Sequence, residues 1–191
     1  MSKKLWEASE TLKNKSNLLK FEKFLSKKYT YKITKNYSEI LNWSINNSKE
    51  FWSSIWDFTK VKGKKTNNFK FSKDFINNKF LINSKLNFAE NLLRKNDNSK
   101  AITFISETGF REVRSWKNLN LNTSRLINFF KKNKIKKKDR VAAYMPNLIE
   151  TVECFLATSS LGAIWSSCSP DFGTQGLIER FSQIQPKILI I

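Results

Sequence analysis

Histidine is absent from the 191 residues, and cysteine occurs only twice, as Cys154 and Cys168. A catalytic group built around an imidazole base is therefore excluded within this chain. The two cysteines form no Cys-x-x-Cys pair, so a structural zinc site lacks its usual ligands. Both stand among apolar neighbours, and we expect them to be small core residues rather than reactive thiols.

Glycine and proline are also scarce, with five and three residues. The glycines are too dispersed to form a loop whose backbone amides could surround a phosphate chain. No proline occurs before Pro146, so the first half of the chain lacks the strongest helix breaker. Together, these absences predict no catalytic residue and no metal site within the chain.

Long apolar runs are missing as well. No stretch reaches the roughly 18 apolar residues that a membrane-spanning helix needs. The N-terminal residues 1–7 lack the apolar segment of a signal peptide. We therefore expect a cytoplasmic protein without a membrane partner.

Acidic residues are few, with 16 Asp and Glu against 35 Lys and Arg, and the formal net charge is +19. Such an excess is compatible with an anionic partner, which could be nucleic acid, acidic lipid or a phosphorylated ligand. Lysine is common in every segment, however, and a compositional bias explains the charge more simply. The densest run, residues 131–138, fits a solvated helix end better than a nucleic-acid contact, and we expect no specific nucleic-acid partner.

What the chain has is apolar material, with 40% hydrophobic and 14% aromatic residues, enough for a sizeable core. Residues 1–97 show helical spacing of apolar side chains. Ser48, before an acidic first turn, is expected to cap one helix. A lysine-rich loop is expected over residues 60–73. The apolar positions of these predicted helices are Leu18, Leu19, Phe21, Phe24, Leu25, Ile40, Leu41, Trp43, Phe51, Trp52, Ile55 and Trp56.

Residues 98–191 alternate between strand and helix patterns. A hairpin is expected first, with its turn at residues 107–109, and three further strands are each preceded by a helix. Ser115 is expected to cap the first helix, Asn147 with Glu150 the second, and Gly162 to end that second helix. The predicted strands are 101–105, 110–114, 140–144, 163–168 and 187–191, and the predicted helices end near residues 132, 161 and 184.

This order predicts an α/β fold. An N-terminal helical segment, 1–97, is followed by the first part of a parallel or mixed sheet with covering helices, 98–191. The last residues, 187–191, form an apolar strand of the kind that is buried on both faces of a sheet. An apolar strand at an open edge favours aggregation. We therefore expect more sheet to follow in the intact protein, and the isolated chain to be poorly soluble.

Four stretches stand in a characteristic order along the chain, namely 36–45 with 50–58, 86–94, 139–147 and 161–173. Together they resemble acyl-CoA synthetases of the acyl-adenylate-forming superfamily. The run 161–173 is similar to the acetoacetyl-CoA branch more than to the acetyl-CoA branch. The run 139–147 resembles a strand and turn of the family, with Lys138 where glycine is usual. The resemblance covers nearly the whole chain.

The resemblance implies a two-step reaction in the intact protein. A carboxylic acid attacks ATP to give an acyl-adenylate and pyrophosphate, and the CoA thiol then displaces AMP. It implies acetoacetate, ATP, CoA and Mg²⁺ as substrates and cofactors, and a place in lipid metabolism. The family's phosphate loop, its acidic and arginine motifs and its C-terminal lysine are not found here. We therefore expect this chain alone to be inactive, to bind none of these ligands tightly, and to need the remainder of the enzyme.

The resemblance also implies one possible ligand contact. In the acetyl-CoA branch, the loop that corresponds to Ser169, Pro170, Asp171 and Phe172 touches the CoA nucleotide. Only Phe172 keeps the family residue. Asp171 would repel a CoA phosphate unless a cation intervenes, and capping of the next helix is its favoured role. We expect Phe172 and Trp165 in the core, and Arg180 on an exposed helix face.

Three other functions stay open. An acetyl- or propionyl-CoA synthetase would share most of the resemblance, since acid specificity depends on residues outside this chain. A basic nucleic-acid-binding protein would account for the charge, but the aromatic residues follow buried helical spacing and are not interleaved with lysine. An interaction module that ends at Ile191 is disfavoured by the apolar last strand.

Overall fold

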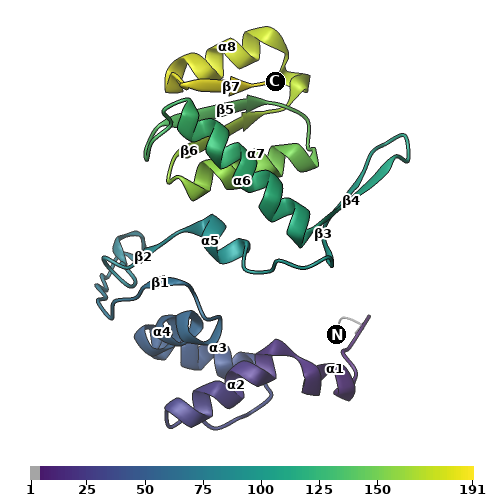
Figure 1. Cartoon of the computed structure of the whole chain (residues 1–191). Coiled ribbons are helices and arrows are strands. Elements are labelled where there is room, and N and C mark those ends of the chain that lie inside the picture. The colour runs from purple at the N-terminus through teal and green to yellow at the C-terminus, as the bar shows by residue number, and fades with distance from the viewer. Residues whose placement is uncertain (1–4) are drawn as a thin grey trace. The chain divides into compact units, whose positions relative to one another are not determined.

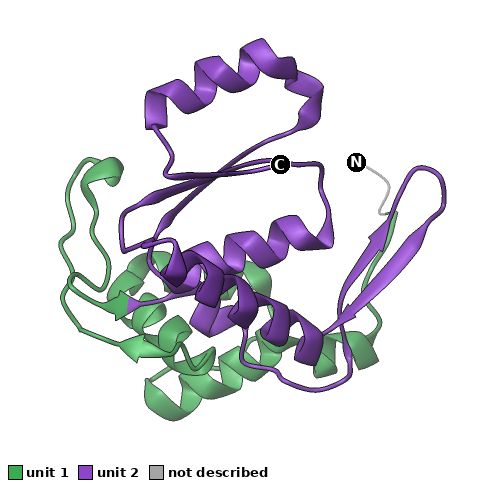
Figure 2. Ribbon diagram, turned by 45° about the horizontal axis from the view of Figure 1, so that its top comes forward, with its two compact units in different colours: residues 1–85 green, residues 86–191 purple. Residues whose placement is uncertain are grey.

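A computed structural model describes residues 5–191 of the chain, which divides into two compact units at Lys85/Leu86 (Figure 2). The composition changes later, near residue 97. The short helix α5 (Phe88–Leu92) belongs to the second unit because Ala89 packs there against Leu119 and Leu156. Each unit has its own hydrophobic core.

The first unit is helical, as predicted. It contains α1 (Glu10–Lys15), α2 (Asn17–Lys28), α3 (Tyr37–Asn46) and α4 (Ser48–Phe58). Phe21, Leu25 and Ile40 form its buried centre, with aromatic side chains of α2, α3 and α4 packed around them. The predicted apolar stripe is not buried throughout, since Leu41 and Trp52 are each 42% exposed.

The prediction that Ser48 caps α4 is wrong. Asn47 occupies the N-cap position and makes no side-chain capping bond. The Ser48 hydroxyl instead donates to the carbonyl oxygens of Ser44 (3.2 Å) and Ile45 (2.8 Å), at the end of the preceding helix. Helices α3 and α4 are nearly continuous, so the hydroxyl finds a free carbonyl closer than a free amide.

One carboxylate is buried in the first unit. Glu22 on α2 is 1% exposed. It accepts hydrogen bonds from the hydroxyls of Tyr31 (2.8 Å) and Thr34 (3.2 Å). Burial, and then the hydrogen bond with Glu22, raise the pKa of Tyr31 to about 12. The rest of the unit is largely irregular, with β1 (Gly63–Lys64), a 3-10 turn η1 (Phe75–Asn77) and the start of β2 (Lys85–Leu86).

The second unit begins with the predicted hairpin. Strand β3 (Lys100–Ile105) pairs antiparallel with β4 (Arg111–Ser115). Gly109 in the turn has φ +83°, a conformation that glycine adopts without strain. The hairpin forms a two-stranded sheet of its own, separate from the other strands.

The remaining strands form the predicted parallel sheet. Its order is β6 (Ile164–Cys168), β5 (Arg140–Tyr144), β7 (Ile188–Ile190), and both pairings are parallel. The central strand β5 carries Val141, Ala142 and Ala143, all fully buried. This burial explains why β5 is a continuous apolar run rather than an alternating one.

Three helices cover this sheet: α6 (Trp116–Lys132), α7 (Ile149–Ser160) and α8 (Gly173–Ile184). Figure 1 shows α8 on one face of the sheet and α6 with α7 on the other. Phe130 of α6 and Ala157 of α7 pack against Val141, whereas Phe181 of α8 packs with Ala142 and Cys168 on the opposite side. Cys154 and Cys168 are both 5% exposed, which confirms them as core residues.

The predicted helix ends are partly confirmed. Ser115 caps α6 by accepting from the Asn118 amide at 3.2 Å, and Gly162 follows α7 with φ +66°. The capping box at Asn147 is wrong, because α7 starts after Leu148 without any side-chain cap. The Thr151 hydroxyl instead donates to the Pro146 carbonyl at 2.8 Å and closes the entry turn.

Candidate functional site

The carboxyl ends of β5 and β6 lie side by side. Tyr144, the last residue of β5, is paired with Cys168, the last residue of β6. The Met145 amide extends this pairing by donating to the Cys168 carbonyl at 3.2 Å. In parallel α/β sheets, ligands bind in crevices outside this edge of the strands. The loops that follow β5 and β6 are therefore candidates for a functional site.

The loop after β6 contains the four residues that the resemblance singled out, Ser169 to Phe172. Pro170–Phe172 form a 3-10 turn, η2, capped by the Ser169 hydroxyl, which accepts from the Asp171 amide at 3.4 Å. The same hydroxyl donates to the Asp171 carboxylate at 2.6 Å. The Tyr144 hydroxyl donates to the Pro170 carbonyl at 2.8 Å and ties the loop to β5. The loop is thus fixed to the sheet by hydrogen bonds.

These contacts overturn the predicted role of Asp171 as a helix cap. Helix α8 has Phe172 at its N-cap position and no side-chain capping bond. Gly173 turns the chain into α8 with φ +63°, and nothing within 4 Å would obstruct a Cβ there. The left-handed backbone alone therefore favours glycine at this position.

Phe172 is exposed, not buried as expected, with 52% of its surface open to solvent. The Arg180 guanidinium lies over its ring, 4.2 Å from the centroid, which is the geometry of a cation–π contact. A Cβ at Gly176 would lie 3.3 Å from the Phe172 Cβ, a tight contact that glycine avoids. Arg180 is exposed, as predicted. Trp165 packs against the core cluster of α6 and α7, which also confirms its prediction.

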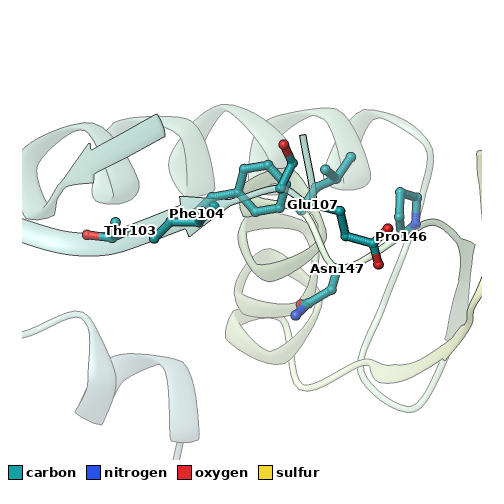
Figure 3. A pocket seen from close by; sticks show the side chains of 8 residues that line it. Thr103, Phe104, Glu107, Pro146 and Asn147 are labelled. Atoms are coloured by element: carbon teal, nitrogen blue, oxygen red, sulfur yellow. The ribbon is translucent and has the colours of Figure 1, made fainter. Parts of the chain in front are cut away.

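A cleft of about 580 Å³ opens beside the other loop of this edge. Figure 3 shows its walls, with Thr103, Phe104 and Glu107 contributed by the hairpin, and Pro146 and Asn147 by the loop after β5. Glu107 is the only charged residue in its lining. A negatively charged cleft of this kind does not suit a phosphate group.

Arg114 holds the hairpin wall of the cleft against α7. Its guanidinium Nε lies 2.9 Å from Glu153 Oε1, without hydrogen-bond alignment, and a terminal nitrogen lies 3.0 Å from Glu150 Oε1. Glu153 is 3% exposed and also accepts from the Asn122 amide at 3.0 Å. Burial raises the pKa of the Glu153 carboxyl. Sequence reasoning missed this pair, since the only signal was two glutamates on one face of α7.

The described residues offer little reactive chemistry of their own. Across residues 5–191, no group of three or more Asp, Glu, Cys or His side chains is placed to hold a metal ion. Burial, followed by the charges of Glu153 and Glu150, raises the pKa of the Cys154 thiol to about 11, so the thiol stays protonated at neutral pH. The same residues contain no helix that is both long and apolar enough to cross a bilayer.

Comparison with known families assigns the second unit. Residues 89–191 match the family described as "AMP-binding enzyme". The chain belongs to this AMP-binding enzyme family. The match begins within α5 and takes in the hairpin, the parallel sheet and its helices.

Relatives of this AMP-binding enzyme chain include acetoacetyl-CoA synthetases. The one from Rhizobium meliloti is 37% identical over 188 residues, which cover 98% of this chain and 29% of the relative. The one from Xenopus tropicalis is 39% identical over 160 residues, covering 81% and 24%. The chain therefore spans only about a quarter of the length of these relatives.

A solved structure shares the fold of both units. Acetoacetyl-CoA synthetase from Streptomyces lividans superposes with a TM-score of 0.88 over 98% of this chain and 30% of its own, at 23% sequence identity. The α/β fold predicted from the sequence is confirmed, including its resemblance to the acetoacetyl-CoA branch.

Proposed function

We propose that the protein carrying these residues is an ATP-dependent ligase that converts acetoacetate and CoA to acetoacetyl-CoA through an acyl-adenylate. The observation that supports this most is the 37% identity to an acetoacetyl-CoA synthetase along 98% of the chain. The matched length includes the run 161–173, which forms β6 and the candidate loop. Activation of acetoacetate would place the protein in lipid metabolism, and we propose a cytoplasmic location.

Within this function, the chain supplies scaffold rather than reacting groups. The first step transfers AMP from ATP to the acid, and the second transfers the acyl group to the CoA sulfur. Both nucleophiles belong to the substrates: the carboxylate of the acid displaces pyrophosphate from ATP, and the CoA thiol displaces AMP from the acyl-adenylate. The chain has no histidine that could act as a base in either step, and its cysteines are buried. Among the described residues, nothing fits Mg²⁺. We therefore assign the ATP and Mg²⁺ sites to residues outside this chain, and we propose that residues 1–191 alone are inactive.

Among the described residues, the loop Ser169–Pro170–Asp171–Phe172 is the element that we assign to a ligand, the nucleotide end of CoA. CoA carries phosphates, and Asp171 by itself would repel them. The Ser169 hydroxyl donates a hydrogen bond to the Asp171 carboxylate at 2.6 Å. The Arg180 guanidinium lies beside the same loop, 4.2 Å from the centroid of the Phe172 ring. Arginine binds phosphate with charge-assisted hydrogen bonds. Arg180 is thus the cation that this loop requires.

The function is tested on the protein as its own gene expresses it. Release of AMP from ATP is measured with CoA, Mg²⁺ and either acetoacetate, acetate or propionate. We expect kcat/KM for acetoacetate to exceed the others at least tenfold, a difference of about 1.4 kcal/mol in transition-state binding. A preference for acetate or propionate would support the neighbouring synthetase instead. No AMP release with any acid would refute a ligase.

The CoA contact is tested separately with Arg180→Gln. The first half-reaction needs no CoA, so acetoacetate-dependent exchange of pyrophosphate into ATP should be unchanged. KM for CoA should rise about tenfold, as expected for one lost charge-assisted hydrogen bond at an exposed site. The matched control is Arg125→Gln, an exposed arginine on α6. An unchanged KM for CoA, or equal effects of both variants, would remove Arg180 from the site.

A further inference from the structure

A dense cluster of lysines stands at the opposite edge of the sheet from the candidate loop. Six of the eight residues from 131 to 138 are lysine, and they connect the end of α6 with the start of β5. All six are exposed. We refer to these residues, together with Phe129, as the basic end of the second unit.

The basic end is a fixed loop rather than a flexible tail. Ile135, in its middle, is 4% exposed and packs into the core beside Phe130 and Val141. The Ile135 amide donates to the Phe130 carbonyl at 3.0 Å, and the Lys138 amide to the Gly162 carbonyl at 3.0 Å. The lysine side chains are therefore held together on one structured surface.

Its charge is not neutralised by the protein. Asp139 is the only acid next to the run, and its Oδ2 already accepts from the Lys136 amide (2.7 Å) and the Lys187 ammonium (2.8 Å). The hydrogen bond from Lys187, and then that from the Lys136 amide, lower the pKa of Asp139. Within residues 5–191, none of the six lysines forms an ion pair with a carboxylate. The cluster thus presents six unpaired positive charges.

An exposed aromatic ring accompanies the charges. Phe129, in the last turn of α6, is 51% exposed, whereas its neighbour Phe130 is completely buried. Basic residues beside an exposed phenylalanine are typical of surfaces that rest on anionic lipid headgroups, where the ring enters the interface. The cluster contains no arginine, the residue favoured for bidentate contacts with nucleic-acid phosphates and bases. The cleft beside the hairpin has none of these lysines in its lining, and all six are exposed.

We propose that the basic end binds the surface of anionic phospholipid membranes and makes this protein a peripheral membrane protein. The sequence predicted no membrane partner because it contains no segment that could span a bilayer, and peripheral binding goes beyond that prediction. Peripheral binding needs no such segment. The basic end lies at the amino ends of the parallel strands, and the candidate loop at their carboxyl ends, so both can be occupied together.

The test is co-sedimentation of the protein, as its own gene expresses it, with vesicles of phosphatidylcholine alone or with 30 mol% phosphatidylserine added. A sample without vesicles records any protein that pellets by itself. Each lysine near such a surface strengthens binding about fivefold. The variant Lys132→Gln, Lys134→Gln, Lys136→Gln should therefore bind the anionic vesicles about a hundredfold more weakly. A control with the same net charge replaces three exposed lysines of the first unit, Lys23, Lys27 and Lys32, with glutamine. The control should bind within threefold of the unaltered chain.

A second measurement needs no variant. Acetylation of lysines is mapped with and without anionic vesicles, and we expect protection at residues 131–138 but not at Lys23, Lys27 or Lys32. Equal binding by both triple variants, or protection spread evenly over all lysines, would reduce the effect to net charge and overturn the proposal. Binding to a 30-nucleotide RNA that survives 150 mM salt, while vesicle binding does not, would favour nucleic acid and overturn it too.

Discussion

Replacing Arg114 with methionine tests whether its contact with Glu153 holds the hairpin on α7. Methionine keeps an unbranched apolar side chain but removes the guanidinium. In the variant, the buried carboxylate of Glu153, which is 3% exposed, loses the cation that lies 2.9 Å away in the unaltered chain. Loss of one partner from a buried ion pair costs about 3–5 kcal/mol. The Arg114 side chain is 17% exposed and partly solvated, so we expect the lower end, about 3 kcal/mol at pH 8.

The loss should depend on pH. Burial raises the pKa of Glu153 above its ordinary 4.5, and the charge of Arg114 opposes this rise. Without Arg114 the pKa rises further. A carboxyl whose pKa is raised by folding favours the folded state below its unfolded pKa, and that contribution disappears as pH rises through the folded pKa. The variant should therefore be most destabilised near pH 8 and regain stability toward pH 5, where Glu153 takes up a proton.

Native-state hydrogen exchange of the β4 and α7 amides measures this change in the second unit alone. About 3 kcal/mol corresponds to roughly a hundredfold loss of protection at pH 8. Arg111→Met, an exposed neighbour on the same strand, is the control and should change protection less than threefold. Equal protection in the two variants, or a loss at Arg114 that is the same at pH 5 and pH 8, would refute the reasoning.

Three further outcomes are expected. Phe130→Ala should cost about 3–5 kcal/mol in urea unfolding because Phe130 is fully buried, whereas Phe129→Ala, at a 51% exposed site, should cost under 1 kcal/mol; similar losses would contradict the packing. Gly173→Ala and Gly173→Asn should each lower the free energy of unfolding by about 1–3 kcal/mol, because φ +63° with ψ 175° is a backbone conformation that only glycine adopts without strain. Calorimetry that finds either variant as stable as the unaltered chain would contradict this. Absorbance at 295 nm should show Tyr31 ionising near pH 12 in the folded chain. Its contribution to stability is therefore present below about pH 10 and lost between pH 10 and 12. Ionisation near pH 10 in the folded chain would contradict the raised pKa of Tyr31.

The regular elements of the second unit could be predicted because their signals are local. The hairpin follows from two strand-like segments on either side of the turn Glu107, Thr108 and Gly109, and β5 from a short apolar run. Ser115 caps α6 as predicted, because its partner is the amide three residues along the chain. Helix and strand patterns are properties of neighbouring residues, and neighbours are what a sequence displays.

The helix starts at Asn147 and Asp171 were predicted by the same rules and were wrong. At each place another bond competes, from the Thr151 hydroxyl to the Pro146 carbonyl and from the Ser169 hydroxyl to the Asp171 carboxylate. A capping motif states what a side chain can do, and the surrounding structure decides which available partner it takes. The exposure of Phe172 has the same origin, because nothing in the local pattern distinguishes a ring under Arg180 from a ring in the core.

By itself, the sequence determined the types of elements, their order, the absence of histidine chemistry and the resemblance to acyl-CoA synthetases. Only the tertiary structure decided that β5 lies between β6 and β7, that Arg114 reaches Glu153, and that six lysines stand together around a buried Ile135. The physical reason is the distance along the chain over which each interaction acts. Helix and strand preferences act over a few residues, whereas burial and charge pairing depend on residues that folding brings together from distant parts of the chain.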